Sequence, residues 1–332
     1  MQVLDATDRD VDQIVALFKQ YNFALKERKW LEWKYFRNPY GQAHSYKIVA
    51  EDRIVGTTSL LPRSFYFRGR KLTCLQSVDS LLGNEVRGQG LFRKMIESVA
   101  ARTPERSGDD YFFLGFVSLP ASVRALAGAG WHRLADFRLY TRFINIEPAL
   151  QSLGMGVVSR KAAQAWKWMN DRLPGHSDKD IEVMEVGEFG KGMNDLFSNE
   201  RVYGDRSDAF FDWRVKENPM AEIKRFALKE AEGIAGYFVC RAEGRSLEII
   251  DCKFKMQHPR YLRSFVRYVS ETDGADKIDC RILPHGECGK LFAQCGFLRR
   301  GRAGSVFVHH AAEAALPLDE CHWQLSLIDS DW

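Results

Sequence analysis

The spacing of apolar residues changes several times along the chain, and the order of the changes predicts a mixed α/β fold. A short strand near residues 2–7 precedes a segment, about 8–21, in which apolar residues recur at helical spacing. A second helix is expected from about residue 24. It must end near Asn38, because the residue before a proline disfavours helical backbone.

The following segments predict three antiparallel strands and then alternating helices and strands. Tight polar turns separate the three strands, and the apolar run "YFFLGFV" is typical of a buried central strand. The expected elements are strands at about 46–51, 54–67 and 71–82, a helix at 88–102, a strand at 111–117, a helix at 120–129 and two closing strands near 131–146.

A second copy of this pattern follows in the same chain. The stretch "LEWKYFRNPYG" (31–41) resembles "FFDWRVKENPM" (210–220). A constant offset over several positions in similar contexts indicates an internal duplication. Four pairs of residues are 180 positions apart: Trp33 and Trp213, Asn38 and Asn218, Pro39 and Pro219, and Gly56 and Gly236.

The duplication predicts an α/β (α+β) protein with two tandem domains, each a mixed, mostly antiparallel twisted sheet flanked by helices. In the second copy we expect a first strand and helix, the Trp-Asn-Pro helix, strands near 223–229, 233–242 and 245–254, and a helix at 258–272. The predicted division is a first domain at 1–146, a helix and linker at 147–180, a second domain at 181–310 and a tail at 311–332 that belongs to neither copy.

Composition narrows the class of protein. A hydrophobic fraction of 45% and a charged fraction of 28% are ordinary for a globular protein. No run of about 18 apolar residues predicts a membrane span, and the acidic N-terminus does not resemble a secretory signal. Seven irregularly spaced cysteines without zinc spacing are expected to be reduced, which favours a cytoplasmic location and no metal site. The net charge of +4 is too small to favour a nucleic acid partner.

The stretch "NEVRGQGLFRKMIESVA" (84–100) holds the most informative motif, a pair of glycines where a strand gives way to a helix. A simple turn is one interpretation. A dinucleotide-binding fingerprint is excluded, because it would need glycine at the position of Arg93. Backbone N–H groups at a helix start attract phosphate, and glycines allow its close approach, so the pair predicts a pyrophosphate site. The surrounding half is basic, with 22 Lys and Arg against 16 Asp and Glu in residues 1–150, a net +6.

The order of elements around this loop resembles the GNAT superfamily of N-acetyltransferases. Their pyrophosphate loop is Arg/Gln-x-x-Gly-x-Gly/Ala, and "RGQGLF" (87–92) matches its Arg and central Gly, with Phe92 in place of the last small residue. The chain is also similar to a two-domain branch associated with polysaccharide biosynthesis. The resemblance covers about 1–146 well and 180–310 in outline.

This resemblance implies binding of an acyl-CoA, usually acetyl-CoA, as acyl donor. The pantetheine would lie between two splayed strands, near 75–82 and 111–117, and the pyrophosphate on the backbone of the loop. The CoA-binding residues so implied are Leu81, Leu82, Gly83, Arg87, Gly88, Gln89, Gly90, Leu91, Phe92 and Ser118, and also Ser122, which otherwise only caps its helix. In the second copy, Pro259 stands where a loop N–H is needed, so we expect CoA only in the first copy.

Candidate catalytic residues are two carboxylates. Asp79 interrupts the apolar strand "LQSVDSLL" and is our first candidate for the general base, with a structural carboxylate as the alternative. Glu85 is the second candidate. The tyrosine that serves as general acid in many GNAT enzymes is replaced by Leu126. Two interpretations are open for the aromatic residues Tyr21, Trp30 and Tyr35: they line a groove for the acceptor, or they belong to the hydrophobic core.

The predicted function is transfer of an acetyl or other acyl group from CoA to a primary amine of a small molecule. The resemblance to the polysaccharide-associated branch suggests an amino sugar as the acceptor. A non-catalytic module that binds CoA or a partner is the alternative. A more distant alternative is transfer of amino acids from tRNA, as in Fem-type transferases. Those enzymes lack the CoA loop that this chain keeps. The acidic end of the tail, with Asp329, is expected to be solvated, although some two-domain relatives use the C-terminus as a base.

Overall fold

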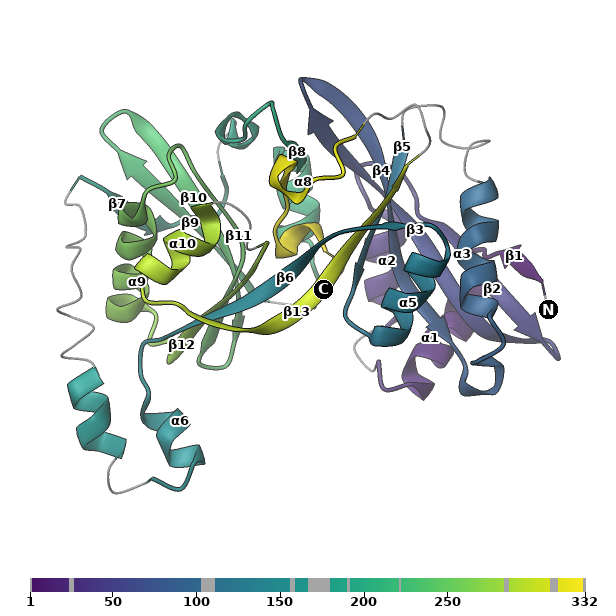
Figure 1. The fold of residues 1–332 in the computed structure, drawn as a ribbon, viewed down its shortest axis with the longest axis horizontal. Helices are drawn as coiled ribbons and strands as arrows, with labels where there is room; N and C mark the ends of the chain where they lie inside the picture. Colours follow the sequence, from purple (N-terminus) through teal and green to yellow (C-terminus); the bar gives the residue numbers. More distant parts are fainter. Residues whose placement is uncertain are drawn as a thin grey trace.

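The structure is a computed structural model, and it describes residues 2–23, 27–102, 111–155, 159–166, 180–189, 192–220, 222–283, 287–310 and 316–330. Its strands and helices form two halves joined by one continuous sheet (Figure 1). The predicted class, a mixed and mostly antiparallel sheet flanked by helices, is confirmed.

The first half follows the predicted order closely, except at its end. Two closing strands were expected near 131–146, but the described chain forms one long strand there, β6. The elements are β1 (Val3–Asp5), η1 (Asp8–Asp10), α1 (Val11–Gln20), α2 (Arg28–Phe36), β2 (His44–Ala50), β3 (Arg53–Phe67), β4 (Arg70–Leu82), η2 (Asn84–Val86), α3 (Leu91–Arg102), β5 (Tyr111–Val117), α5 (Pro120–Gly128), β6 (His132–Phe143) and α6 (Glu147–Ser152).

The second half departs from the prediction after its first strand. Where a helix was expected, the described residues form a short 3-10 turn and a short strand, η3 and β8. The elements are β7 (Glu182–Glu185), η3 (Met193–Leu196), β8 (Val202–Gly204), α8 (Asp208–Phe211), the π-helical turn η4 (Asp212–Lys216), β9 (Glu222–Glu230), β10 (Gly233–Glu243), β11 (Ser246–Phe254), α9 (Pro259–Thr272), β12 (Lys277–Ile282), α10 (Glu287–Gln294), β13 (Leu298–His310), η5 (Glu320–His322), β14 (Trp323–Gln324) and η6 (Leu327–Asp329).

The last strands of the two halves are exchanged. β13 pairs with β5 of the first half, and β6 pairs with β12 of the second. The two exchanged strands also pair with each other, and they run side by side between the halves in Figure 1. The sequence assigned each strand to its own copy. The exchange instead covers edges that β5 and β12 would otherwise expose, and it joins both halves into one sheet.

The duplicated tryptophans face each other across the seam between the halves. Trp33 and Trp213 stack with their ring centroids 5.3 Å apart and an interplanar angle of 24°. The Nε1–H of Trp33 donates to the carbonyl of Trp213 (2.8 Å), and the Nε1–H of Trp213 donates to the carbonyl of Trp33 (3.1 Å). Such reciprocal contacts arise when two equivalent residues lie on either side of a local two-fold relation.

The other repeated residues also have matching physical roles. Asn38 and Asn218 each accept a hydrogen bond from the backbone N–H two residues later, which ends the preceding helical turn. A Cβ on Gly56 would come within 2.6 Å of the Leu82 side chain, and one on Gly236 within 2.6 Å of the Lys253 carbonyl. Both glycines therefore permit a close approach of the next strand.

The helices of the first half lie on opposite faces of its sheet. Buried residues of α1 and α2 share one hydrophobic cluster with α8, η4 and η6, whereas those of α3 and α5 pack on the other face. None of the helices formed by the described residues is both long and apolar enough to span a bilayer.

The tail does not remain in solvent as expected. Trp323 is fully buried beside Phe65 and Phe112, and β14 pairs with β8. Asp329 is 1% exposed. The physical reason is Arg206, which binds both oxygens of Asp329, at 2.9 and 2.8 Å, and removes the cost of an unpaired buried charge.

Candidate functional site

Strands β4 and β5 separate from each other toward their C-terminal ends. Their parallel pairing runs from Thr73↔Tyr111 to Ser77↔Gly115 and stops there. Beyond it, β4 contains a bulge, because the pairing with β3 shifts by one residue between Val78 and Leu81. Asp79 within the bulge has a left-handed backbone, with φ of 53°. A bulge bends its strand, so β4 leaves β5 and opens a gap between two adjacent strands.

The glycine loop lies directly after the opened end of β4. Gly88 and Gly90 both have positive φ, 78° and 70°, which favours glycine at both positions. Among the described residues, the backbone N–H groups of 88 to 92 have no hydrogen-bond acceptor outside the helix itself, and residues 88–90 are exposed. The N–H of Arg87 differs from expectation, because it donates to the Asn84 carbonyl (3.3 Å). The open set of donors thus starts at Gly88.

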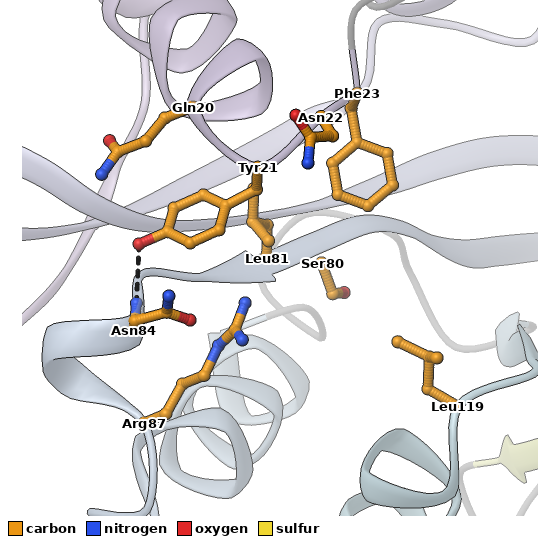
Figure 2. Close-up of a pocket in the computed structure, with 9 residues that line it drawn as sticks. All are labelled: Gln20, Tyr21, Asn22, Phe23, Ser80, Leu81, Asn84, Arg87 and Leu119. Atoms are coloured by element: carbon orange, nitrogen blue, oxygen red, sulfur yellow. Dashed lines mark hydrogen bonds between the residues drawn. The ribbon is translucent and has the colours of Figure 1, made fainter.

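A cavity of about 490 Å³ lies beside the loop (Figure 2). Its wall combines the end of α1, the bulged part of β4, the η2 turn and the segment before α5. The lining residues are Gln20, Tyr21, Asn22, Phe23, Ser80, Leu81, Asn84, Arg87 and Leu119. Because the wall includes the segments that follow the separation of β4 and β5, a group held between these strands would reach the cavity.

Several residues that the resemblance implied lie elsewhere. The N–H of Gly83 is already used, since it donates to the Val55 carbonyl at 2.8 Å. Ser118 is exposed and Ser122 is half-buried, and neither lines the cavity. Ser122 does not cap α5 either, because the N-cap position is Leu119. Of the predicted CoA contacts, Leu81 and Arg87 line the cavity.

Asp79 is enclosed below the cavity floor. Its side chain is 0% exposed, and its Oδ2 accepts from the Lys34 Nζ and the Tyr35 hydroxyl, both at 2.8 Å. Burial, together with the Asp79 charge, raises the pKa of Tyr35 well above its ordinary value, so this hydroxyl stays a donor. Such a setting supports the alternative reading of Asp79, a structural carboxylate tied to its neighbours. Trp30 and Tyr35 likewise belong to the buried core.

Tyr21 lines the cavity and links it to Glu85. The Tyr21 hydroxyl accepts from the Asn84 N–H (2.7 Å) and donates to Glu85 Oε2 (3.1 Å). Figure 2 shows the Tyr21 ring on the cavity wall with its hydroxyl against Asn84. Glu85 is exposed, as the sequence predicted. At the position of the family's tyrosine, Leu126 is 1% exposed and offers no proton.

The corresponding place in the second half is closed to phosphate. Helix α9 begins with Pro259, which has no N–H, and its N-cap His258 already accepts from the Arg260 N–H at 3.2 Å. The buried carboxylate is retained there: Asp251 follows the last β11–β12 pair by two residues, as Asp79 follows the last β4–β5 pair. Within the described residues, this frame occurs together with open N–H groups in the first half alone.

A comparison with protein families accounts for this arrangement. The family model described as "Acetyltransferase (GNAT) domain" matches residues 2–131. These residues form a GNAT acetyltransferase domain. Enzymes of this family use an acyl-CoA as substrate, and the match ends just before β6, the strand that crosses to the other half. No curated protein sequence matches the chain significantly.

Solved structures extend the likeness from the GNAT domain to nearly the whole chain. A GCN5-related N-acetyltransferase from Anabaena variabilis has a TM-score of 0.65 at 13% identity, over 92% of this chain and 72% of that one. A tandem GNAT protein from the clavulanic acid biosynthesis pathway has a TM-score of 0.56 at 11% identity, over 93% and 98%. Saccharomyces cerevisiae N-myristoyltransferase, with bound myristoyl-CoA, gives 0.56 at 10% identity, over 92% and 77%. At these identities the likeness concerns the fold.

The sequence did not single out several cavity residues of the GNAT domain. Ser80, Asn84 and Phe23 were missed, although each lies one or two positions from a residue that was named: Asp79, Glu85 or Tyr21. The interruption of an apolar strand at Asp79 was the available signal for Ser80. Asp79 marked a bulge, and the next residue in this bulge, Ser80, lines the cavity.

Proposed function

We propose that the protein is an acyl-CoA-dependent N-acyltransferase that acylates a primary amine of a small molecule, and that only the first half binds CoA. The observation that supports this most strongly is the set of open backbone N–H groups at Gly88 to Phe92, held by two positive-φ glycines at the start of α3. The separated strands β4 and β5 lead from this loop to the cavity.

The reaction needs a group that takes a proton from the amine. The new amide C–N bond forms as the thioester C–S bond breaks, and acyl-CoA supplies the activated acyl group. We assign the base to Glu85 acting with Tyr21, since the Tyr21 hydroxyl lies on the cavity wall and already donates to Glu85. As Tyr21 accepts the amine proton, its own proton passes to the Glu85 carboxylate.

Replacing Gly90 with valine is expected to lower the affinity for acetyl-CoA by about tenfold or more while the fold is kept. A branched residue disfavours the left-handed backbone that directs the loop N–H groups outward. Calorimetry should give one acetyl-CoA per chain for the wild type and much weaker binding for the variant.

The matched control is Gly69→Val. Gly69 has nearly the same backbone, with φ of 74°, and open space around it, but it lies in the turn between β3 and β4. It should bear the same strain without any change in affinity for acetyl-CoA. Equal affinity losses in both variants, or none in Gly90→Val, would contradict the pyrophosphate assignment.

Replacing Glu85 with glutamine is expected to lower kcat/KM by about 100-fold, within the usual contribution of a positioned base. The loss should be greatest at low pH, where the amine is charged, and should shrink as rising pH deprotonates the amine in solution. Tyr21→Phe, which breaks the link to Glu85, should give a similar pH dependence. A pH–rate series with a loss that is constant over the range would remove Glu85 from this role.

The acceptor is found by following release of free thiol from acetyl-CoA with a panel of small amines, amino sugars included. Amide formation in step with thiol release establishes the activity. If acetyl-CoA binds stoichiometrically and no amine in the panel is acylated, the alternative of a non-catalytic CoA-binding module gains support.

A further inference from the structure

The cavity wall carries a single formal charge among its nine described lining residues, and that charge is Arg87. The polar remainder consists of neutral amides and hydroxyls. Glu85, the acidic residue of the η2 turn, does not line the cavity and accepts a hydrogen bond from Tyr21. A lone guanidinium facing a cavity of this size selects for an anionic group in whatever occupies it.

The side chain of Arg87 is held in place by two contacts that leave its tip available. Its Nε–H donates to the Leu82 carbonyl at 2.9 Å, and its guanidinium lies over the Tyr21 ring, 5.2 Å from the centroid. The described residues offer no acceptor to its two Nη groups. The planar end is therefore oriented for two parallel hydrogen bonds to one carboxylate or phosphate.

The direction of this side chain separates it from the phosphate-binding backbone. From the start of the glycine loop it turns back toward the end of β4, whereas the open N–H groups belong to residues 88 to 92. Figure 2 shows the guanidinium pointing toward Leu81 and the middle of the cavity. The loop backbone and the Arg87 side chain thus point in different directions.

Two partly exposed apolar side chains complete the wall. Phe23 is 44% exposed and Leu119 is 65% exposed, although both are large and hydrophobic. They lie on the side of the cavity away from Asn84 and Arg87 in Figure 2. An occupant that covers them would gain apolar burial at one end and an ion pair at the other.

We propose that the amine acceptor carries an anionic group, a carboxylate or a phosphate, which Arg87 binds, next to an apolar or ring portion that contacts Phe23 and Leu119. This inference rests on the proposed function and specifies the acceptor of that same site. Arg87 is a specificity residue for the acceptor, and the CoA phosphates are bound by the loop backbone.

The test uses two matched pairs of amines with the full-length protein: phenylalanine against phenethylamine, and glucosamine 6-phosphate against glucosamine. Each pair differs by the anionic group, so the pair that responds tells a carboxylate acceptor from a phosphate one. We expect the wild type to favour an anionic member in kcat/KM. Arg87→Gln should remove about 10- to 100-fold of that preference, the usual value of a charge-assisted hydrogen bond, with the affinity for acetyl-CoA unchanged.

Two further variants sharpen the result. Arg87→Lys keeps the charge but not the planar fork and should restore the preference only in part. Arg93→Gln removes the same charge from an exposed position on α3, where Arg93 lies 3.4 Å from Glu97, and should change nothing. Binding of each amine to the CoA-loaded protein, measured by calorimetry, gives a readout that does not depend on turnover.

The inference is overturned if the wild type treats both members of each pair alike, or if neither anionic amine binds the CoA-loaded protein. It is also overturned if Arg87→Gln weakens acetyl-CoA binding and leaves the acceptor preference intact, since Arg87 would then belong to the pyrophosphate site. In each of these cases acetyl-CoA binding at the loop would still support the proposed function. That function fails separately if the wild type does not bind acetyl-CoA.

Discussion

Replacing Lys34 with methionine is expected to lower the free energy of unfolding by about 3–5 kcal/mol, because it leaves Asp79 buried without its cation. The Lys34 and Asp79 side chains are both 0% exposed, and the Tyr35 hydroxyl, a neutral donor, would still bind the carboxylate. Urea denaturation followed by circular dichroism measures the change. The double variant Lys34→Met with Asp79→Asn should recover part of the loss, since no unpaired charge is then buried.

The matched control is Lys216→Met. Lys216 forms an ion pair with Glu188 at 2.9 Å, but the two side chains are 56% and 67% exposed. Its removal should destabilise the fold far less than removal of Lys34, because an exposed ion pair contributes little. If Lys34→Met costs no more than this control, the buried pair does not stabilise the fold.

The same residues separate the two interpretations of Asp79. A structural Asp79 predicts that Asp79→Asn lowers stability and reduces the rate equally at every pH. A general base would instead give a rate loss of about 10²–10⁴-fold that is greatest at low pH. The enclosed position beside Lys34 and Tyr35 leads us to expect the first result.

Replacing Arg206 with methionine is expected to cost about 3–5 kcal/mol at neutral pH, because two buried carboxylates lose the cation that they share. Asp329 keeps the more distant Arg63, at 3.7 Å. The Arg206 side chain donates to Asp251 at 2.6 Å and to both oxygens of Asp329. These bonds fix the C-terminal segment against the second half. Thermal or urea unfolding measures the loss, and limited proteolysis should cut the tail of the variant first.

The effect of Arg206 should depend on pH. Burial raises the pKa of Asp329, but the charge and hydrogen bonds of Arg206 outweigh burial, so its folded pKa lies below the ordinary value. A lowered folded pKa gives stability that is present above the unfolded pKa and is lost as pH falls through the folded one. The difference between wild type and Arg206→Met should therefore be greatest at neutral pH and shrink below about pH 4.

An exposed pair of the same geometry serves as the control. Arg245 binds both oxygens of Asp276, at 2.6 and 2.9 Å, with 69% of its side chain exposed. Arg245→Met should destabilise the fold far less than Arg206→Met, because an exposed ion pair contributes little. A stability difference between wild type and Arg206→Met that stays constant from pH 7 to pH 3 would argue against ionised Asp329 as the partner that matters.

The local elements followed from the sequence because their signals are local. Alternating and helical apolar spacing predicted β2 to β5, α3 and α5, and the repeated Trp, Asn, Pro and Gly residues predicted the duplication. Glycines at 88 and 90 predicted an anion-binding loop, since positive φ and a helix start depend on neighbouring residues alone. Pro259 led to the prediction that the second copy does not bind phosphate for the same reason, and it stands at the start of α9 as expected.

The features that only the tertiary structure determined are contacts between residues far apart in the sequence. The exchange of β6 and β13 is a choice between equivalent strand edges, and both pairings satisfy the same apolar pattern. The environment of a carboxylate depends on partners that are distant in sequence. The sequence made Asp79 a candidate base, and the structure places it beside Lys34 and Tyr35; Asp329 was expected to be solvated, and it pairs with Arg206. The orientation of the Arg87 side chain is a third such feature. Its contacts with Tyr21 and Leu82 determine it, and the loop motif does not.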